Sequence, residues 1–267
     1  MTIIKTDKFP QLAYRKSGQG PALVLIHGFP ENGGLWGRVV PLLENDFTVI
    51  VPDLPGTGNS TLGTAGASME DMADGIKMLL ENVGLSRAVI AGHSMGGYVA
   101  LAFADRYPDM LAGLALVHST ASADNDDKKE TRRKSIALIT KGGKEPFIKQ
   151  MIPNLFAPTF REAHPSVIEE QVKRGMELEA DSMVAFYEAM MNRPDRTDLL
   201  EKATFPVQFI IGKEDALVPA EVALAQSRMA SRNFVSLYSN TGHMSMIEQP
   251  SSLARDLSDF VQYCYNN

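Results

Sequence analysis

The sequence predicts an α/β protein in which a mostly parallel sheet is flanked by helices and interrupted by one helical insertion. Apolar runs of strand length alternate with helical stretches as far as Ser119, and the pattern returns after residue 198. This alternation is typical of a parallel sheet with helices on its faces. A chain of 267 residues is long enough for one core with one insertion. We therefore expect a core of residues 1–119 and 199–267 and an insertion of residues 120–198.

Apolar runs rich in β-branched residues predict the strands. Most of these runs are continuously apolar, as expected for strands that are covered on both faces. They comprise residues 22–26, 47–51, 88–91, 114–117, 207–211 and 234–238. Two short segments before them, residues 3–6 and 12–15, lie close together in the sequence. We expect these two to form an antiparallel hairpin at the edge of the sheet.

The clearest helix of the core is predicted over residues 69–83. Ser68 is a suitable N-cap, and Asp71 occupies the third helical position, where an acidic residue is favoured. Gly84 then ends the helix, because glycine readily adopts the left-handed conformation found there.

The insertion shows no strand pattern. It contains several prolines, the pair Gly142-Gly143 and amphipathic stretches over residues 168–178 and 183–191, which together predict short helices. Residues 124–134 carry many charges of both signs. We interpret this run as a solvated loop or helix face rather than as a binding tail.

Composition excludes several classes of partner. Asp and Glu total 32 against 26 Lys and Arg, and the net charge of -6 would repel nucleic acid. No segment approaches the roughly 20 apolar residues of a membrane span, and residues 1–16 lack a signal-peptide core. The single cysteine, Cys264, cannot form an internal disulfide and is interpreted as a packing residue. We expect a cytoplasmic protein.

A candidate nucleophile follows the predicted strand 88–91. The segment Gly92-His93-Ser94-Met95-Gly96 fits the pattern G-x-S-x-G and precedes a stretch compatible with a helix, residues 97–107. A tight turn between strand and helix would expose the Ser94 hydroxyl, and the two glycines avoid crowding in it. The alternative is a glycine-rich turn with an incidental serine.

A serine hydroxyl needs a base, and His243 is the best placed of the five histidines. It follows the last predicted strand, where a loop can bring it to the carboxyl edge of the sheet. His27 and His93 are expected to orient backbone groups, His118 ends a strand, and His164 lies in the insertion. The alternative for His243 is a loop histidine with a local hydrogen bond.

Asp215 is the candidate acid that would orient this base. It follows the predicted strand 207–211 and lies between Ser94 and His243, in the order serine, acid, histidine. Glu214 is its immediate competitor, and a solvated turn is the alternative interpretation of both.

Two backbone N–H groups are candidates for an oxyanion hole. Met95 would donate from the N-terminus of the predicted helix, where free amides favour negative charge. Phe29 would donate from His27-Gly28-Phe29-Pro30, directly after a strand. The alternative is a turn that simply ends the strand.

These motifs together resemble the α/β-hydrolase superfamily over nearly the whole chain except the insertion. His27-Gly28-Phe29-Pro30 is similar to the family's HGFP oxyanion loop, and residues 92–97 to its nucleophile elbow. Residues 53–60 are similar to a structural loop of the family. The resemblance implies an eight-stranded, mostly parallel sheet with the insertion as a cap over the active site. It implies a serine hydrolase of carboxylesterase type that acts on a small ester or acyl substrate without metal or cofactor.

The resemblance leaves some functions open. Family dehalogenases and epoxide hydrolases have Asp where this chain has Ser94, so we disfavour both, and we interpret Trp36 as a packing residue rather than a halide ligand. A ligand receptor on a hydrolase fold remains an alternative, as does perhydrolase or lactonase chemistry through the same serine. The sequence does not predict the substrate or the oligomeric state.

Methionines are frequent in the insertion. Met151, Met176, Met183, Met190 and Met191 all lie there, and ordinary core filling is the simpler explanation. The alternative is an adaptable apolar wall over an acyl pocket, for which Met183 and Met190 are the candidates.

Overall fold

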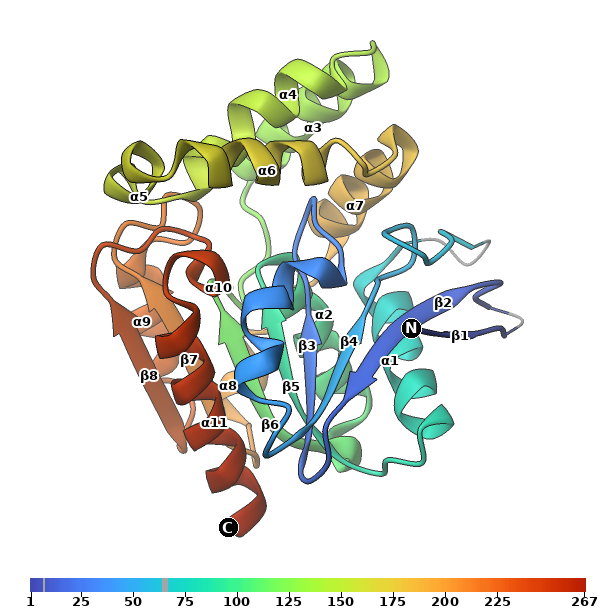
Figure 1. Cartoon of the computed structure of the whole chain (residues 1–267), viewed down its shortest axis with the longest axis vertical. Helices are drawn as coiled ribbons and strands as arrows, with labels where there is room; N and C mark the ends of the chain where they lie inside the picture. The colour runs from blue at the N-terminus through green and yellow to red at the C-terminus, as the bar shows by residue number, and fades with distance from the viewer. Residues whose placement is uncertain (7, 64–66) are drawn as a thin grey trace.

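An eight-stranded sheet runs through the computed structural model, which describes residues 1–6, 8–63 and 67–267 (Figure 1). The strand order is β1-β2-β4-β3-β5-β6-β7-β8. The strands are β1 (Thr2–Ile4), β2 (Leu12–Ser17), β3 (Ala22–Ile26), β4 (Thr48–Pro52), β5 (Ala88–His93), β6 (Leu111–Val117), β7 (Val207–Gly212) and β8 (Asn233–Tyr238). β1, β2 and β4 pair antiparallel, and all other neighbours pair parallel. The predicted fold class and edge hairpin are confirmed.

The core lies on the central strands. Every residue of β3, β4, β5, β6 and β7 is buried, because helices cover both faces of a sheet of this kind. The edge strand β8 differs from its neighbours. It alternates between half-buried and exposed residues, and Val235 and Leu237 are exposed.

Helices of the core begin and end close to the predicted positions. α1 (Met69–Asn82) is capped by Ser68, whose hydroxyl accepts a hydrogen bond from the Asp71 N–H at 3.0 Å. The predicted helix 97–107 is observed two residues earlier at its start, as α2 (Met95–Arg106). The remaining elements are η1 (Gly33–Arg38), η2 (Val40–Leu42), η3 (Pro108–Met110), α8 (Thr197–Glu201), α9 (Ala220–Ser227), α10 (Ser245–Glu248) and α11 (Pro250–Asn266).

The insertion is helical and gathers at one end of the sheet (Figure 1). Its elements are α3 (Asp126–Thr140), α4 (Lys144–Met151), η4 (Ile152–Leu155), α5 (Pro158–Ala163), α6 (Pro165–Gly175) and α7 (Ala180–Asn192). α6 ends before residue 178, so the predicted amphipathic stretch 168–178 is only partly helical. The expected boundary at residue 198 falls inside α8, so the domain division is approximate there.

Two residues interpreted as packing residues are buried. Trp36 is fully buried, and Cys264 lies under the sheet, where a Cβ on Gly113 of β6 would approach its sulfur to 2.5 Å. Among the described residues, none of the helices has both the length and the apolar character that crossing a bilayer requires.

Candidate active site

Ser94 lies at a strained turn between β5 and α2. Its backbone has φ 51° and ψ -115°, which a residue with a side chain rarely adopts. A Cβ on Gly92 would lie 2.2 Å from the Gly96 carbonyl oxygen, so the turn can close only around glycine. The Ser94 N–H donates to the Val117 carbonyl at 2.9 Å, and its carbonyl accepts from the Ser119 hydroxyl at 2.8 Å. These bonds hold the conformation in place.

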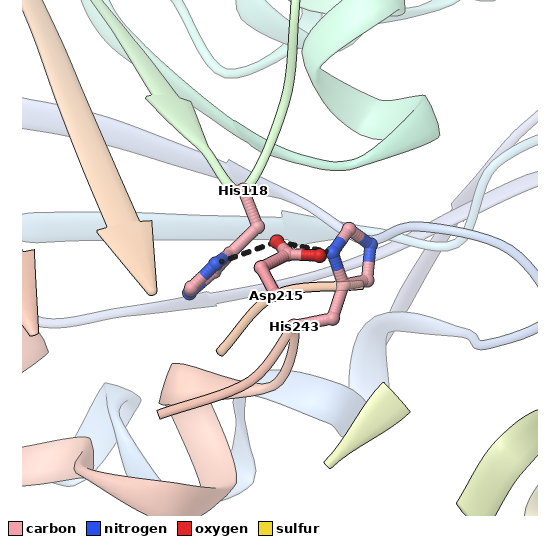
Figure 2. Close-up of side chains that lie close together, drawn as sticks. All are labelled: His118, Asp215 and His243. Atoms are coloured by element: carbon pink, nitrogen blue, oxygen red, sulfur yellow. Dashed lines mark hydrogen bonds and ion pairs between the residues drawn. The ribbon is translucent and has the colours of Figure 1, made fainter. Parts of the chain in front are cut away.

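Asp215 lies in the loop after β7, and its carboxylate is held on both oxygens. Oδ1 accepts from the N–H groups of Leu217 at 2.9 Å and Val218 at 3.0 Å. Oδ2 accepts from His243 Nδ1 at 2.7 Å (Figure 2). The competing carboxylate, Glu214, is exposed, whereas Asp215 is buried. The geometry therefore joins Asp215, and not Glu214, to His243.

His118 also donates to Asp215, which the sequence did not reveal. Its Nδ1 lies 3.2 Å from the same Oδ2 atom that accepts from His243 (Figure 2). His118 directly follows β6 at φ 50°, and burial lowers its pKa. Burial alone would raise the pKa of Asp215, but the charge of His243 and the hydrogen bonds from both histidines hold it well below its usual range. Asp215 is thus an ionised carboxylate with four donors.

These side chains are also the group that could bind a metal. Among the described residues, ligand atoms of His118, Asp215 and His243 lie within 4.8 Å of one another. Both histidines use Nδ1 to donate to the Asp215 carboxylate, so hydrogen bonds account for the arrangement. We therefore assign the group no metal.

His243 is brought next to the Ser94 turn by His93. His93 Nε2 donates to the His243 carbonyl oxygen at 2.9 Å, and the two rings lie 4.8 Å apart. His243 Nε2 is buried and bonds to none of the described residues. Because Nδ1 faces Asp215, Nε2 is the atom that can accept a proton. The expectation that His93 orients backbone agrees with its bond to a carbonyl oxygen.

Glu248 fixes the loop around His243, and the sequence gave no signal for this role. Its carboxylate accepts from the N–H groups of Gly242 and Met244 at 3.1 Å, on either side of the histidine. It also accepts from the N–H of Ala157, in the insertion, at 3.0 Å. The His243 N–H donates to the Leu155 carbonyl, also in the insertion, at 2.6 Å. His243 is therefore hydrogen-bonded to the insertion, and the loop around it to both the insertion and Glu248.

Phe29 and Met95 belong to two segments that lie next to Ser94. Met95 is the first residue of α2, so its N–H is at a helix N-terminus. Phe29 follows β3, and a Cβ on its neighbour Gly28 would approach the Ser94 Cβ to 3.1 Å. Both backbone N–H groups thus belong to segments that adjoin the serine.

A cavity of about 400 Å³ opens on Ser94 between the core and the insertion, and we call it the Ser94 cavity. Met190 lines it, but Met183 does not. Because Met183 is fully buried in the hydrophobic core cluster, its place in a substrate pocket is corrected to packing. Other apolar lining residues are Phe29, Phe147, Met151, Leu155, Leu217 and Val218.

The charged run 124–134 contributes to the same cavity. It forms most of α3, and one helix face turns to the cavity with Asp127, Lys128, Thr131, Arg132 and Ser135. Arg132 is fixed by Asp124 at 2.5 Å, which also pairs with Arg193 at 2.9 Å. Asp127, Lys128 and Thr131 are exposed even though they line the cavity, so the interpretation of this run as a solvated helix face agrees with most of its residues.

Sequence comparisons relate the chain to known proteins. A family profile described as alpha/beta hydrolase fold matches residues 21–250. A pimeloyl-[acyl-carrier protein] methyl ester esterase of Vibrio vulnificus is 30% identical over 272 residues, which cover 94% of this chain and 98% of that protein. A fluoroacetate dehalogenase of Burkholderia sp. is 40% identical over only 105 residues, 38% of this chain and 34% of that protein.

Among solved structures, one superposes closely on this chain over nearly its full length. A thermophilic esterase from Thermogutta terrifontis, crystallised with malate bound, superposes with a TM-score of 0.94 at 32% identity over 99% of both chains. An enol-lactonase from Burkholderia xenovorans superposes with a TM-score of 0.89 at 20% identity over 98% of this chain and 100% of that one. The second likeness concerns the fold alone.

Proposed function

The chain belongs to the α/β-hydrolase family, and from this premise we propose that it is a serine hydrolase that cleaves small carboxylic esters. The observation that carries the proposal is the 2.7 Å bond between Asp215 and His243, whose Nε2 bonds to none of the described residues and whose ring lies 4.8 Å from that of His93, the neighbour of Ser94. Two of the proteins that match over nearly the whole chain are named as esterases. The Ser94 cavity, about 400 Å³ with a mainly apolar wall, suits a small acyl chain.

In the proposed first half of the reaction, Ser94 forms an ester with the acyl group. His243 Nε2 takes the proton from Ser94 Oγ as the oxygen attacks the acyl carbonyl carbon. The N–H groups of Phe29 and Met95 donate to the oxyanion that develops. His243 then gives its proton to the leaving alkoxide, and an alcohol departs. Asp215 keeps His243 in the required tautomer and stabilises the imidazolium.

In the second half, water releases the acid. His243 Nε2 takes a proton from the water as its oxygen attacks the acyl-Ser94 carbonyl. The tetrahedral intermediate collapses, Ser94 Oγ leaves with the proton from His243, and a carboxylic acid departs. Residues 120–198 act in this proposal as a cap that closes the acyl pocket. The single buried cysteine, Cys264, is consistent with work in a reducing compartment such as the cytoplasm.

Hydrolysis of nitrophenyl esters of increasing acyl length tests the proposal. Wild-type protein should show a clear optimum, and Ser94→Ala should lower kcat/KM by about a thousandfold or more, because the nucleophile is lost. Wild-type rates in Ser94→Ala would contradict it. Covalent labelling by a fluorophosphonate without turnover of any ester would indicate a competent nucleophile that acts on a different substrate, whereas neither labelling nor turnover would favour the ligand receptor.

A further inference from the structure

A second cavity lies on the other side of the Phe29-Pro30 segment. It measures about 370 Å³ and shares no lining residue with the Ser94 cavity. Core loops form one wall, with Glu31, Gly56 and Thr57, and the insertion forms the other, with Arg174 and Ser182. A Cβ on Gly56 would lie 2.9 Å from the Ser182 hydroxyl, so the walls approach closely beside it. We call this the Glu31 cavity.

Glu31 is the unusual group in this cavity. Only 4% of its surface is exposed, and its Oε1 atom bonds to none of the described residues. Buried carboxylates are normally paired or fully hydrogen-bonded, because the charged form loses its hydration. Burial accordingly raises the pKa of Glu31 to about 7, and the charge of Glu177 adds to the rise while Arg174 opposes it. Neither the proposed reaction nor the packing of the core uses this side chain.

The other charges around Glu31 do not supply a partner. Glu177 and Glu179 also line the cavity and are acidic. The one cation among the described lining residues, Arg174, is engaged elsewhere: it donates to Glu170 at 2.7 Å and to the Gly34 carbonyl at 3.2 Å. Three carboxylates therefore face one cation that is already paired. Among the described lining residues, the cavity therefore offers Glu31 no cation that is free to pair with it.

We propose that the Glu31 cavity is a binding site for a small organic cation whose ammonium group pairs with Glu31. An ammonium group has the missing charge and up to three N–H donors. The apolar lining residues Pro30, Leu62 and Leu178 would contact a short alkyl part. The ligand would contact both the core loops and the insertion, and it would bind independently of Ser94.

Titration calorimetry of the full chain with n-butylammonium tests the site. 1-Butanol serves as an uncharged probe of the same length. Glu31→Gln removes the charge at the buried position, and Glu169→Gln removes one at an exposed position of α6 that does not line the cavity. We expect saturable binding of the amine but not of the alcohol, an affinity at least about tenfold lower in Glu31→Gln, and less than about twofold lower in Glu169→Gln. Ser94→Ala should bind as tightly as wild type.

Wild-type protein supplies a second readout that needs no variant. Between pH 6 and pH 8 the amine stays protonated while Glu31 becomes ionised, because its pKa is about 7. The affinity should therefore rise about tenfold over this range. The proposal is wrong if the amine does not bind, if 1-butanol binds equally, if Glu31→Gln keeps wild-type affinity, or if the affinity does not change with pH. None of these binding measurements depends on ester hydrolysis. The cation site and the proposed hydrolase function can therefore fail independently of each other.

Discussion

At the scale of single residues, the Asp215 carboxylate depends on donors from distant parts of the chain. Two neighbouring N–H groups hold Oδ1, but Oδ2 depends on His243 and on His118, which is 97 residues away in the sequence. His118 is neutral when buried, so it adds a hydrogen bond without adding charge. We infer that this hydrogen bond fixes the direction of Oδ2 toward His243.

Replacing His118 should therefore affect the rate more than substrate binding. In His118→Phe, Oδ2 loses one donor in a buried place, a loss of about 1–3 kcal/mol in hydrogen bonding. We expect kcat to fall about tenfold with little change in KM. His118→Gln, whose amide can donate, should recover much of the rate. The measurement is the kinetics of ester hydrolysis for both variants. An equal fall of kcat in His118→Phe and His118→Gln would contradict the positioning role, and so would a loss of stability with unchanged kcat.

Glu31 should make stability depend on pH. Folding raises its pKa from 4.5 to about 7, so the fold favours the protonated carboxyl. The stabilising contribution is complete below pH 4.5 and is lost as the pH rises through about 7. The side chain in Glu31→Gln stays neutral at every pH. The free energy of unfolding of Glu31→Gln, relative to that of wild type, should therefore be about 2–3 kcal/mol higher at pH 8 than at pH 5. Urea unfolding at pH 5 and pH 8 measures the free energy of unfolding of both proteins. The same difference between Glu31→Gln and wild type at the two pH values would contradict the prediction.

At the scale of elements, the loop between β8 and α10 connects His243 to the insertion. Glu248 bonds to both neighbours of His243 and to Ala157, and the His243 N–H bonds to Leu155. The η4–α5 part of the insertion is therefore fastened to the core beside the site. Any opening that displaces this part must break two hydrogen bonds and disturb His243.

Glu248→Gln should weaken this connection. An amide has one acceptor oxygen where the carboxylate has two, so at least one of the three N–H groups loses its partner. We expect kcat to fall about tenfold and proteolysis near residues 152–158 to become faster. Glu221→Gln, an exposed position in α9, is the matched control and should change neither. A wild-type kcat together with unchanged proteolysis in Glu248→Gln would show that these hydrogen bonds of Glu248 affect neither catalysis nor the attachment of the insertion.

The elements that could be predicted from the sequence are those with local signals. The Ser94 turn needs glycines within two residues of the serine, and the Ser68 cap needs Asp71 three residues later, so both appear in a short window. The contacts of His118 and Glu248 join residues 97 and 91 positions apart. No periodicity or turn chemistry reports such pairs. For the same reason, the sequence does not reveal which side of α3 lines the cavity.

At the scale of the whole molecule, the Ser94 cavity exists only because the insertion covers the carboxyl edge of the sheet. Its walls come from loops of the core, such as those with Phe29 and Leu217, and from helices α3, α4 and α7. Figure 1 shows these helices together at the end of the sheet. The preferred acyl length of the substrate should therefore change when a residue of the insertion that lines the cavity is replaced, and should not change when another residue of the insertion is replaced.

Replacing Met190, which lines the cavity, and Met183, which does not, with alanine tests this expectation. Met190→Ala should shift the preferred nitrophenyl ester to a longer acyl chain, because Met190 lines the cavity. Met183→Ala should leave the preferred length unchanged and destabilise the protein by about 2–5 kcal/mol, because Met183 is fully buried. Ester series and urea unfolding for both variants provide the measurement. A shift in length for Met183→Ala alone would contradict the assignment of the two side chains.

The central claim is that Ser94 is acylated by the substrate, and it is tested most directly by locating a covalent adduct. Wild-type protein and Ser94→Ala would be treated with a fluorophosphonate, digested and analysed by peptide mass spectrometry. We predict one modified peptide in wild type, with the added mass on Ser94, and none in Ser94→Ala. Unmodified Ser94, or modification at another residue that persists in Ser94→Ala, would contradict the proposed mechanism.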